Sequence, residues 1–309
     1  TEGVLGRVDR VERWRSRLAD TPASLESDVR TGLGLDEFTL EYQPRHELAR
    51  GRVTAVEALL RWRRGHRSHM SPEVYLGALS DASVMDQLGR WVLHNALLQV
   101  ARWEQNRPAD VPAIGISVNV TPAEVVGDGF IDRVALALVA ADVAPELVQL
   151  EVAARSAGVI DATVVERLRA LATLGVGFAL DGVDPSYGRD GLLVAGGGVN
   201  ISRQWIRVVA SDPRAATAIA ELISRVHDAG LTVCAIGVET RAQAAVLTEM
   251  GCDHAQGFLF SEPVPPSELG WQADERQGGG LASAAPPTAS PLGPSGLPER
   301  RGTPRRRPS

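Results

Sequence analysis

Four oxygen-bearing side chains stand inside or directly after apolar runs of the chain. Glu57 lies within Val56-Glu57-Ala58-Leu59-Leu60, where a carboxylate is costly to bury unless it is ion-paired or binds a metal. Asn119, Glu151 and Asp181 occupy similar places in three later runs. Converging hard oxygen ligands suit Mg²⁺, Mn²⁺ or Ca²⁺. Each residue alone is more often a capped or ion-paired core residue, but four in successive strand-like runs favour a metal site.

The elements that would position these residues alternate along the chain. Strand–helix alternation favours a parallel β/α architecture, and eight strands over roughly 230 residues fit a modified (β/α)8 TIM-like barrel better than an open sheet. Barrel enzymes place their chemistry at the carboxyl ends of the strands. The turn Arg50-Gly51-Arg52 is too short for a parallel crossover, so one strand should be antiparallel. The predicted strands are 38–44, 53–62, 115–120, 147–152, 175–181, 198–206, 232–238 and 255–260, and the predicted helices are 72–80, 84–106, 129–141, 161–173, 211–229 and 241–250.

Composition divides the 309 residues into three parts. Residues 1–35 predict a helical connector from an upstream domain, the alternative being a helix packed on the domain surface. Residues 36–270 form the barrel. Residues 271–309 are rich in Pro, Gly and Arg and predict a disordered tail. Its arginine clusters could contact acidic lipid, nucleic acid or a protein, but a solvated tail without a specific partner is the favoured interpretation.

Charge and composition narrow the function classes. A net charge of -6 argues against general binding of nucleic acid. All 32 basic residues are arginine, so no lysine of this chain can act as a base or bind a phosphate. Cys234 and Cys252 lack zinc-ligand spacing and predict reduced core residues. No apolar run approaches the ~20 residues that span a bilayer. We expect a cytoplasmic protein, or the cytoplasmic part of a longer, membrane-attached one.

The chain resembles a known family at its opening motifs. Tyr42-Gln43-Pro44, Glu57-Ala58-Leu59 and Arg61-Trp62 are similar to the start of an EAL domain, the cyclic di-GMP phosphodiesterase family of bacterial signalling. The resemblance runs from about residue 36 to residue 268. It implies that the four oxygen-bearing residues hold a first Mg²⁺ or Mn²⁺ ion and that Arg61 pairs with a substrate phosphate. It also implies ligand contacts for Gln43, Glu239 and Gln256.

Other family positions have changed here. Where active members carry a second aspartate, a Lys-Ile-Asp strand and a Glu-Gly-Val-Glu motif, this chain has Gly182, Asn200-Ile201-Ser202 and Ile236. A two-metal site activates the attacking water in such hydrolysis. The loss of several such groups should bring hydrolysis near to background, because one electrostatic donor is worth roughly 10²–10³ in rate. A second metal site is therefore not expected.

These departures predict a degenerate EAL domain in cyclic di-GMP signalling, which binds the dinucleotide or a protein partner without hydrolysing it. The alternatives are an active phosphodiesterase producing linear pGpG and a scaffold that binds no nucleotide. A missing upstream sensor or signalling domain and a homodimer are further partners that the resemblance allows. No specific nucleic-acid partner is expected.

Overall fold

A computed structural model describes most of the chain. The described residues are 22–63, 72, 75–154, 162–187 and 198–269. The predicted tail, 271–309, and the first part of the predicted connector, 1–21, lie outside them.

Eight strands close into one barrel in the order of the sequence. β1 pairs with both β2 and β8 in antiparallel fashion, and every other neighbouring pair is parallel. The predicted modified (β/α)8 barrel with one antiparallel strand is therefore confirmed. The strands are β1 Phe38–Glu47, β2 Arg52–Trp62, β3 Gly115–Val120, β4 Val148–Ala153, β5 Gly177–Val183, β6 Gly198–Ile201, β7 Thr232–Ile236 and β8 His254–Gln256.

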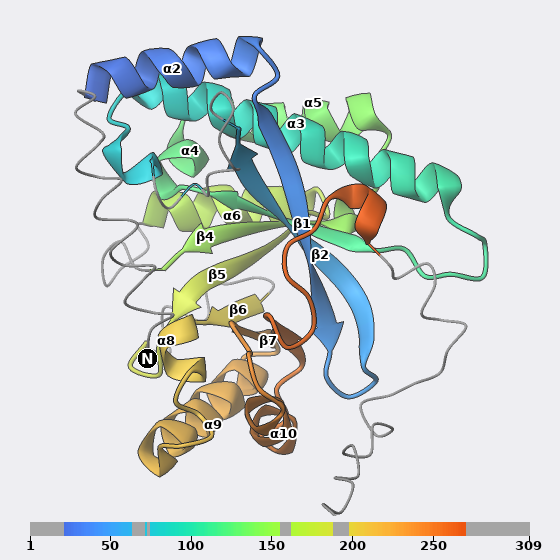
Figure 1. Cartoon of the computed structure of the whole chain (residues 1–309), viewed down its shortest axis with the longest axis vertical. Helices are drawn as coiled ribbons and strands as arrows, with labels where there is room; N and C mark the ends of the chain where they lie inside the picture. The colour runs from blue at the N-terminus through green and yellow to red at the C-terminus, as the bar shows by residue number, and fades with distance from the viewer. Residues whose placement is uncertain (1–21, 64–71, 73–74, 155–161, 188–197, 270–309) are drawn as a thin grey trace, which may run out of the picture.

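Helices surround the strands (Figure 1). Those of the first half, α3 to α6, lie on one side of the molecule, and α9 and α10 lie on the other. Four begin at side-chain caps, from Asp81, Thr121, Asp212 and Thr240. The α-helices are α2 Pro22–Gly34, α3 Ala82–Asn106, α4 Pro122–Val126, α5 Phe130–Ala141, α6 Ala162–Thr173, α8 Arg203–Ile206, α9 Pro213–Asp228 and α10 Arg241–Glu249, and the short 3-10 helices are η2 Leu76–Ala78, η3 Pro145–Leu147 and η4 Pro266–Glu268.

One predicted strand is wrong in its second half. The run 198–206 is a strand only to Ile201, and α8 begins at Arg203. Ile206 is buried. An apolar residue at this position would be buried in a strand or in a short helix, so the apolar pattern could not separate the two. In the predicted helix 72–80, of which residues 73 and 74 lie outside the described ranges, the structure has the 3-10 turn η2, and α4 had no separate prediction.

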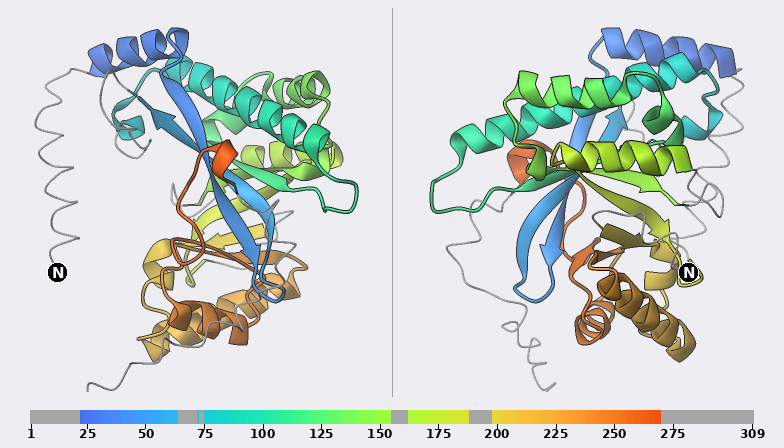
Figure 2. Two further views of the ribbon diagram at one scale, coloured as in Figure 1. Left: turned by 45° about the vertical axis from the view of Figure 1, so that its right-hand side comes forward. Right: turned by 180° about the vertical axis from the view of Figure 1, so that it is seen from behind.

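The helix before the barrel belongs to its core. Leu25 and Val29 of α2 are buried in the same hydrophobic cluster as the barrel strands. Two views show α2 lying along α3 (Figure 2). This packing favours the surface-packed alternative for 22–34, while the role of 1–35 as a connector stays a prediction.

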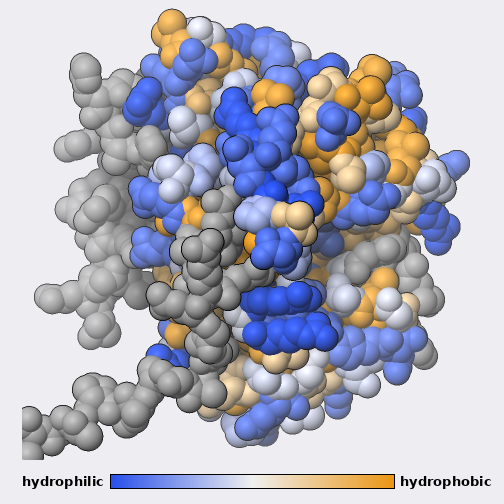
Figure 3. Space-filling model, turned by 90° about the vertical axis from the view of Figure 1, so that its right-hand side faces the viewer, coloured by the Kyte–Doolittle hydropathy of each residue, from blue (hydrophilic) through white to orange (hydrophobic). Residues whose placement is uncertain are grey.

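One face of the molecule carries apolar side chains near α5 (Figure 3). Leu136 and Val139 of this helix are 69% and 80% exposed. No helix within the described ranges has the length and apolar character to cross a membrane.

Candidate functional site at the carboxyl end of the barrel

Strand pairing places the predicted site residues at one level of the barrel. β1 and β2 put Gln43 opposite Glu57. Asn119 of β3 lies beside Glu151 of β4, and Asp181 of β5 lies beside Asn200 of β6. Alternate residues of a strand point to the same face, and all of these positions share the inward face. The four proposed metal ligands are therefore on four neighbouring strands, near their carboxyl ends.

Glu57 is the centre of a hydrogen-bond network that crosses the barrel. Asn119 Nδ2 donates to Glu57 Oε1 at 2.6 Å, and Gln256 Nε2 donates to Glu57 Oε2 at 2.6 Å. The same Gln256 nitrogen lies 2.9 Å from Gln43 Oε1. The structure thus brings together four residues that the sequence predicted as metal or ligand contacts.

The charge state of Glu57 reflects its surroundings. Burial, followed by the negative charge of Glu151, raises the pKa of Glu57 to about 7, although hydrogen bonds from Asn119 and Gln256 lower it. Asp181 adds a further small rise. A nearby cation stabilises the ionised form of carboxylates that raise one another's pKa.

An arginine supplies one such cation from inside the barrel. Arg45 of β1 forms an ion pair with Glu151, and both side chains are more than nine-tenths buried. Its other terminal nitrogen donates to Gln149 Oε1 at 2.8 Å. Glu151 therefore already has a positive partner that lies toward the amino end of the strands.

The donor set has the chemistry for one divalent cation. The carboxylates of Glu57, Glu151 and Asp181, offset by Arg45, leave two negative charges when all are ionised. Within the described ranges, however, no group of three His, Cys, Asp or Glu side chains is gathered closely enough to hold an ion. Asn200 Nδ2 lies 3.4 Å from Asp181 Oδ1. A cation would draw Glu151 away from Arg45, and the residues that would hold it are Glu57, Asn119, Glu151 and Asp181.

Arg61 lies on the same face of β2 as Glu57. Its Nε donates to Glu41 Oε2 at 2.7 Å, and its Nη1 donates to the carbonyl oxygen of Leu60 at 2.9 Å. The predicted phosphate-binding guanidinium is therefore half-buried in an ion pair. An anion would have to compete with Glu41 for it.

The remaining predicted ligand contact lies at the rim. Glu239 pairs with Arg203 at 2.5 Å, and the guanidinium of Arg203 lies 5.6 Å from the centre of the Phe258 ring. Arg203 follows β6, Glu239 follows β7 and Phe258 follows β8. The start of α8 and the two segments that follow β7 and β8 place a cation, a carboxylate and an aromatic face together outside the strand ends.

The positions that lack catalytic groups lie on β5, β6 and β7 or directly after them. Gly182 adopts a left-handed backbone with φ +77°, and Ile236 pairs with Gln256 in the β7–β8 ladder. Asn200 and Ser202 are buried. The half of the barrel formed by β6 and β7 therefore presents no carboxylate or lysine at these positions.

Sequence reasoning missed Arg45, Glu41 and Arg203. Arg45 had a usable signal, because it lies two residues after Gln43 in a strand and must share its inward face. A charged residue in that place needs a partner of opposite charge. The partnership of Arg203 with Glu239 had no such signal, since it joins the start of α8 to a segment after β7 that is distant in sequence.

The closed barrel with one antiparallel strand and acidic residues at its carboxyl end defines the chain as a TIM-like β/α barrel with a candidate active-site mouth. The sequence profile of the EAL domain matches residues 26–263. The chain belongs to the EAL domain family.

Relatives of known name are similar to most of this chain. The bifunctional diguanylate cyclase/cyclic di-GMP phosphodiesterase MucR of Pseudomonas aeruginosa is 31% identical over 256 residues, which are 81% of this chain and 36% of that protein. The cyclic di-GMP phosphodiesterase NbdA of the same organism is 31% identical over 255 residues, 79% of this chain and 31% of the relative. The chain therefore spans about a third of the length of these relatives.

Solved structures agree with the fold. The MucR phosphodiesterase in complex with c-di-GMP has a TM-score of 0.72 at 29% identity, covering 80% of this chain and 99% of that one. The EAL domain of Mycobacterium smegmatis DcpA has a TM-score of 0.60 at 30% identity, covering 74% of this chain and 92% of that domain.

Proposed function

We propose that this chain acts in cyclic di-GMP signalling as a degenerate EAL domain, which binds cyclic di-GMP without hydrolysing it at an ordinary enzymatic rate. Membership of the EAL family and the similarity to a phosphodiesterase solved with c-di-GMP support the choice of cyclic di-GMP as the ligand. The mouth of the barrel is the proposed binding site.

The single observation that carries the proposal is the uneven placement of charge around this mouth. Strands β2 to β5 carry Glu57, Asn119, Glu151 and Asp181 on one inward level, whereas Gly182, Asn200, Ser202 and Ile236 bring no ionisable side chain. One Mg²⁺ or Mn²⁺ ion at the first set would neutralise a phosphate. Without a second cation or a base on β6 and β7, the attacking water is not activated.

The rest of the mouth offers contacts for a charged dinucleotide. Arg61 and Arg203 are guanidinium groups that can exchange their carboxylate partners for phosphate oxygens. Gln43, Gln256 and Glu239 supply amide and carboxylate groups for a base or ribose. Phe258, which is 43% exposed, offers a face for stacking.

An active phosphodiesterase that releases pGpG is the second candidate, because one feature favours it. A carboxylate with a pKa of about 7, such as Glu57, is suited to accept a proton near neutral pH. A scaffold that binds no nucleotide is the third candidate. It is favoured by the ion pairs of Arg45 and Arg61, because both guanidinium groups already have carboxylate partners.

Calorimetry separates nucleotide binding from the scaffold function. Cyclic di-GMP is titrated into the protein with Mg²⁺, with Mn²⁺ and without either ion. The proposal predicts saturable binding that the cation strengthens. Absence of binding under all three conditions would establish the scaffold instead.

A further inference from the structure

A second hollow lies at the opposite end of the barrel from the mouth. It has a volume of about 250 Å³. Its lining includes the residues that begin six of the strands, and because the parallel strands share one direction, these residues lie at the amino end. They are Gly115, Val148, Gly177, Gly198, Thr232 and His254.

Glycine keeps this end of the barrel hollow. Gly115 and Gly177 do not have a positive φ, so their backbone does not require glycine. A Cβ at Gly177 would lie 3.5 Å from the nearest atom, a backbone oxygen of Val148, and one at Gly115 would lie 3.4 Å from a backbone oxygen of Leu147. Both are tolerable contacts. TIM-like barrels usually fill their interior with layers of side chains, whereas glycines at these positions leave space here.

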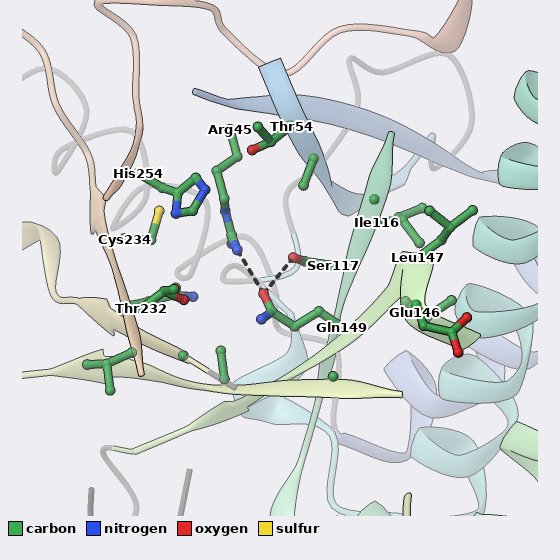
Figure 4. Close-up of a pocket in the computed structure, with 18 residues that line it drawn as sticks. Arg45, Thr54, Ile116, Ser117, Glu146, Leu147, Gln149, Thr232, Cys234 and His254 are labelled. Carbon is green, nitrogen blue, oxygen red and sulfur yellow. Dashed lines mark hydrogen bonds between the residues drawn. The ribbon is translucent and has the colours of Figure 1, made fainter. Parts of the chain in front are cut away.

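Hydrogen-bond donors face this space (Figure 4). Arg45 Nη1 and Ser117 Oγ both donate to Gln149 Oε1, at 2.8 Å and 3.3 Å. These contacts fix the orientation of the amide and direct its NH₂ group toward Gly198, whose Cβ position would be 3.7 Å from Gln149 Nε2. The close-up shows Arg45 extending from β1 into the centre of the lining.

The two opposite charges of the lining are separated, because Arg45 reaches its centre and Glu146 lies at its edge (Figure 4). Among the described residues of the lining, Arg45 is the one arginine, and it carries a permanent positive charge. Burial, followed by the charge of Arg45, lowers the pKa of His254, which is therefore neutral at pH 7. Glu146 is the carboxylate of the lining, and its Oε1 lies against Gly175, 2.8 Å from the position of a Cβ there.

We propose that the hollow at the amino end binds a small oxyanion, a carboxylate or phosphate group, through the guanidinium of Arg45 and the amide NH₂ of Gln149. A guanidinium and an oxyanion form short, charge-assisted hydrogen bonds. The volume is below the ~300–1,000 Å³ of pockets for drug-sized ligands, so the occupant has few non-hydrogen atoms and is not a dinucleotide.

Arg45 also links this site to the mouth, because its Nη2 is bound to Glu151. An anion in the hollow draws Arg45 away from Glu151, which becomes available to a cation. Thermodynamic linkage makes the effect reciprocal, so a cation at the mouth strengthens anion binding. This coupling rests on the metal site of the proposed function, whereas anion binding itself does not.

The first test measures anion binding to metal-free protein. The midpoint of thermal unfolding, Tm, is followed while sulfate or acetate is added at constant ionic strength, with acetamide as the uncharged match for acetate. We expect Tm to rise by about 3–5 °C at concentrations about tenfold above Kd, with saturation. An equal response to acetamide would overturn the proposal.

Variants separate the hollow from general salt effects. Gly177→Leu fills it and should abolish the saturable response, whereas Gly177→Ala should leave a weakened one. A wild-type response in Gly177→Leu would contradict the proposal. If that variant does not fold, wild-type crystals soaked in selenate decide: density beside Arg45 and Gln149 supports the site, and its absence there contradicts it.

The coupling has its own measurement. The Kd for Mn²⁺ is determined with and without saturating sulfate, in wild type and in Gly177→Leu. We expect sulfate to lower the Kd for Mn²⁺ at least about fivefold in wild type only. If sulfate binds but the Kd does not change, the coupling is wrong and the site stands. If Mn²⁺ does not bind at all, the proposed metal site is wrong, and the sulfate titration still tests the hollow.

Discussion

Arg45 is the residue on which both ends of the barrel depend. Its guanidinium is buried, and it is shared between Glu151 and Gln149. Removing one partner of a buried ion pair leaves an uncompensated charge, which typically costs about 3–5 kcal/mol. We therefore expect this side chain to contribute to the free energy of unfolding of the metal-free protein.

Replacing Arg45 with methionine tests that dependence. Arg45→Met should lower the free energy of unfolding of metal-free protein by about 3–5 kcal/mol, measured by urea denaturation. Mn²⁺ should recover more stability in this variant than in wild type, because Glu151 is then free to bind it. The matched control is Arg52→Met, whose ion pair with Glu47 is exposed and should contribute little. Equal effects of the two substitutions would contradict the role of Arg45.

Arg61 offers a sharper test of ligand binding. Arg61→Ala should weaken binding of cyclic di-GMP by at least about tenfold, since a hydrogen bond to a charged group is worth about 1.5–3 kcal/mol. Calorimetry with the matched variant Arg90→Ala, on the exposed face of α3, provides the control. Unchanged binding in Arg61→Ala would support the scaffold interpretation.

At the level of the elements, much of the site could be predicted from the sequence. The strands carrying Glu57, Asn119, Glu151 and Asp181 were expected within two residues of their observed bounds, because β-branched runs and glycine turns mark them. The network joining Gln43, Glu57 and Gln256 could not be derived from the residues alone, since it connects strands that are distant in sequence. The amino-end hollow was also missed, because three glycines give no apolar pattern.

The backbone of Gly257, the middle residue of the Gln256-Gly257-Phe258 motif after β8, packs closely against the backbone of Val238 after β7. A Cβ at Gly257 would lie 2.2 Å from the backbone oxygen of Val238. We expect Gly257→Ala to reduce the free energy of unfolding by about 1–3 kcal/mol or more, as measured by denaturation, because the backbone must shift. Gly77→Ala is the control, since nothing lies within 4 Å of its Cβ position. Full stability of Gly257→Ala would show that the junction is looser than described.

His254, the first residue of β8, makes the stability of the folded protein depend on pH. Burial is the main cause of its lowered pKa, so the folded state favours the neutral imidazole. The unfolded chain binds a proton near the ordinary pKa of 6.5, and stability from this residue is therefore present above pH 6.5 and lost as pH falls below it. Tm should decline less steeply from pH 7 to pH 5.5 in His254→Gln than in wild type. Identical slopes would exclude this contribution.

At the scale of the whole molecule, buried polar side chains, among them Arg45 and Glu151, lie between the proposed binding mouth and the hollow. The mouth carries the residues that resemble a family's first metal site, and β6 and β7 carry changed residues at the positions of hydrolysis. An EAL domain of this composition is expected to report the presence of a nucleotide by binding it.

Incubation of the protein with cyclic di-GMP and Mn²⁺, followed by chromatography of the products, tests the central claim most directly. The proposal predicts that the dinucleotide is recovered intact while calorimetry shows it to be bound. Accumulation of pGpG at about 1 s⁻¹ or faster, the ordinary range of enzymes, would contradict it.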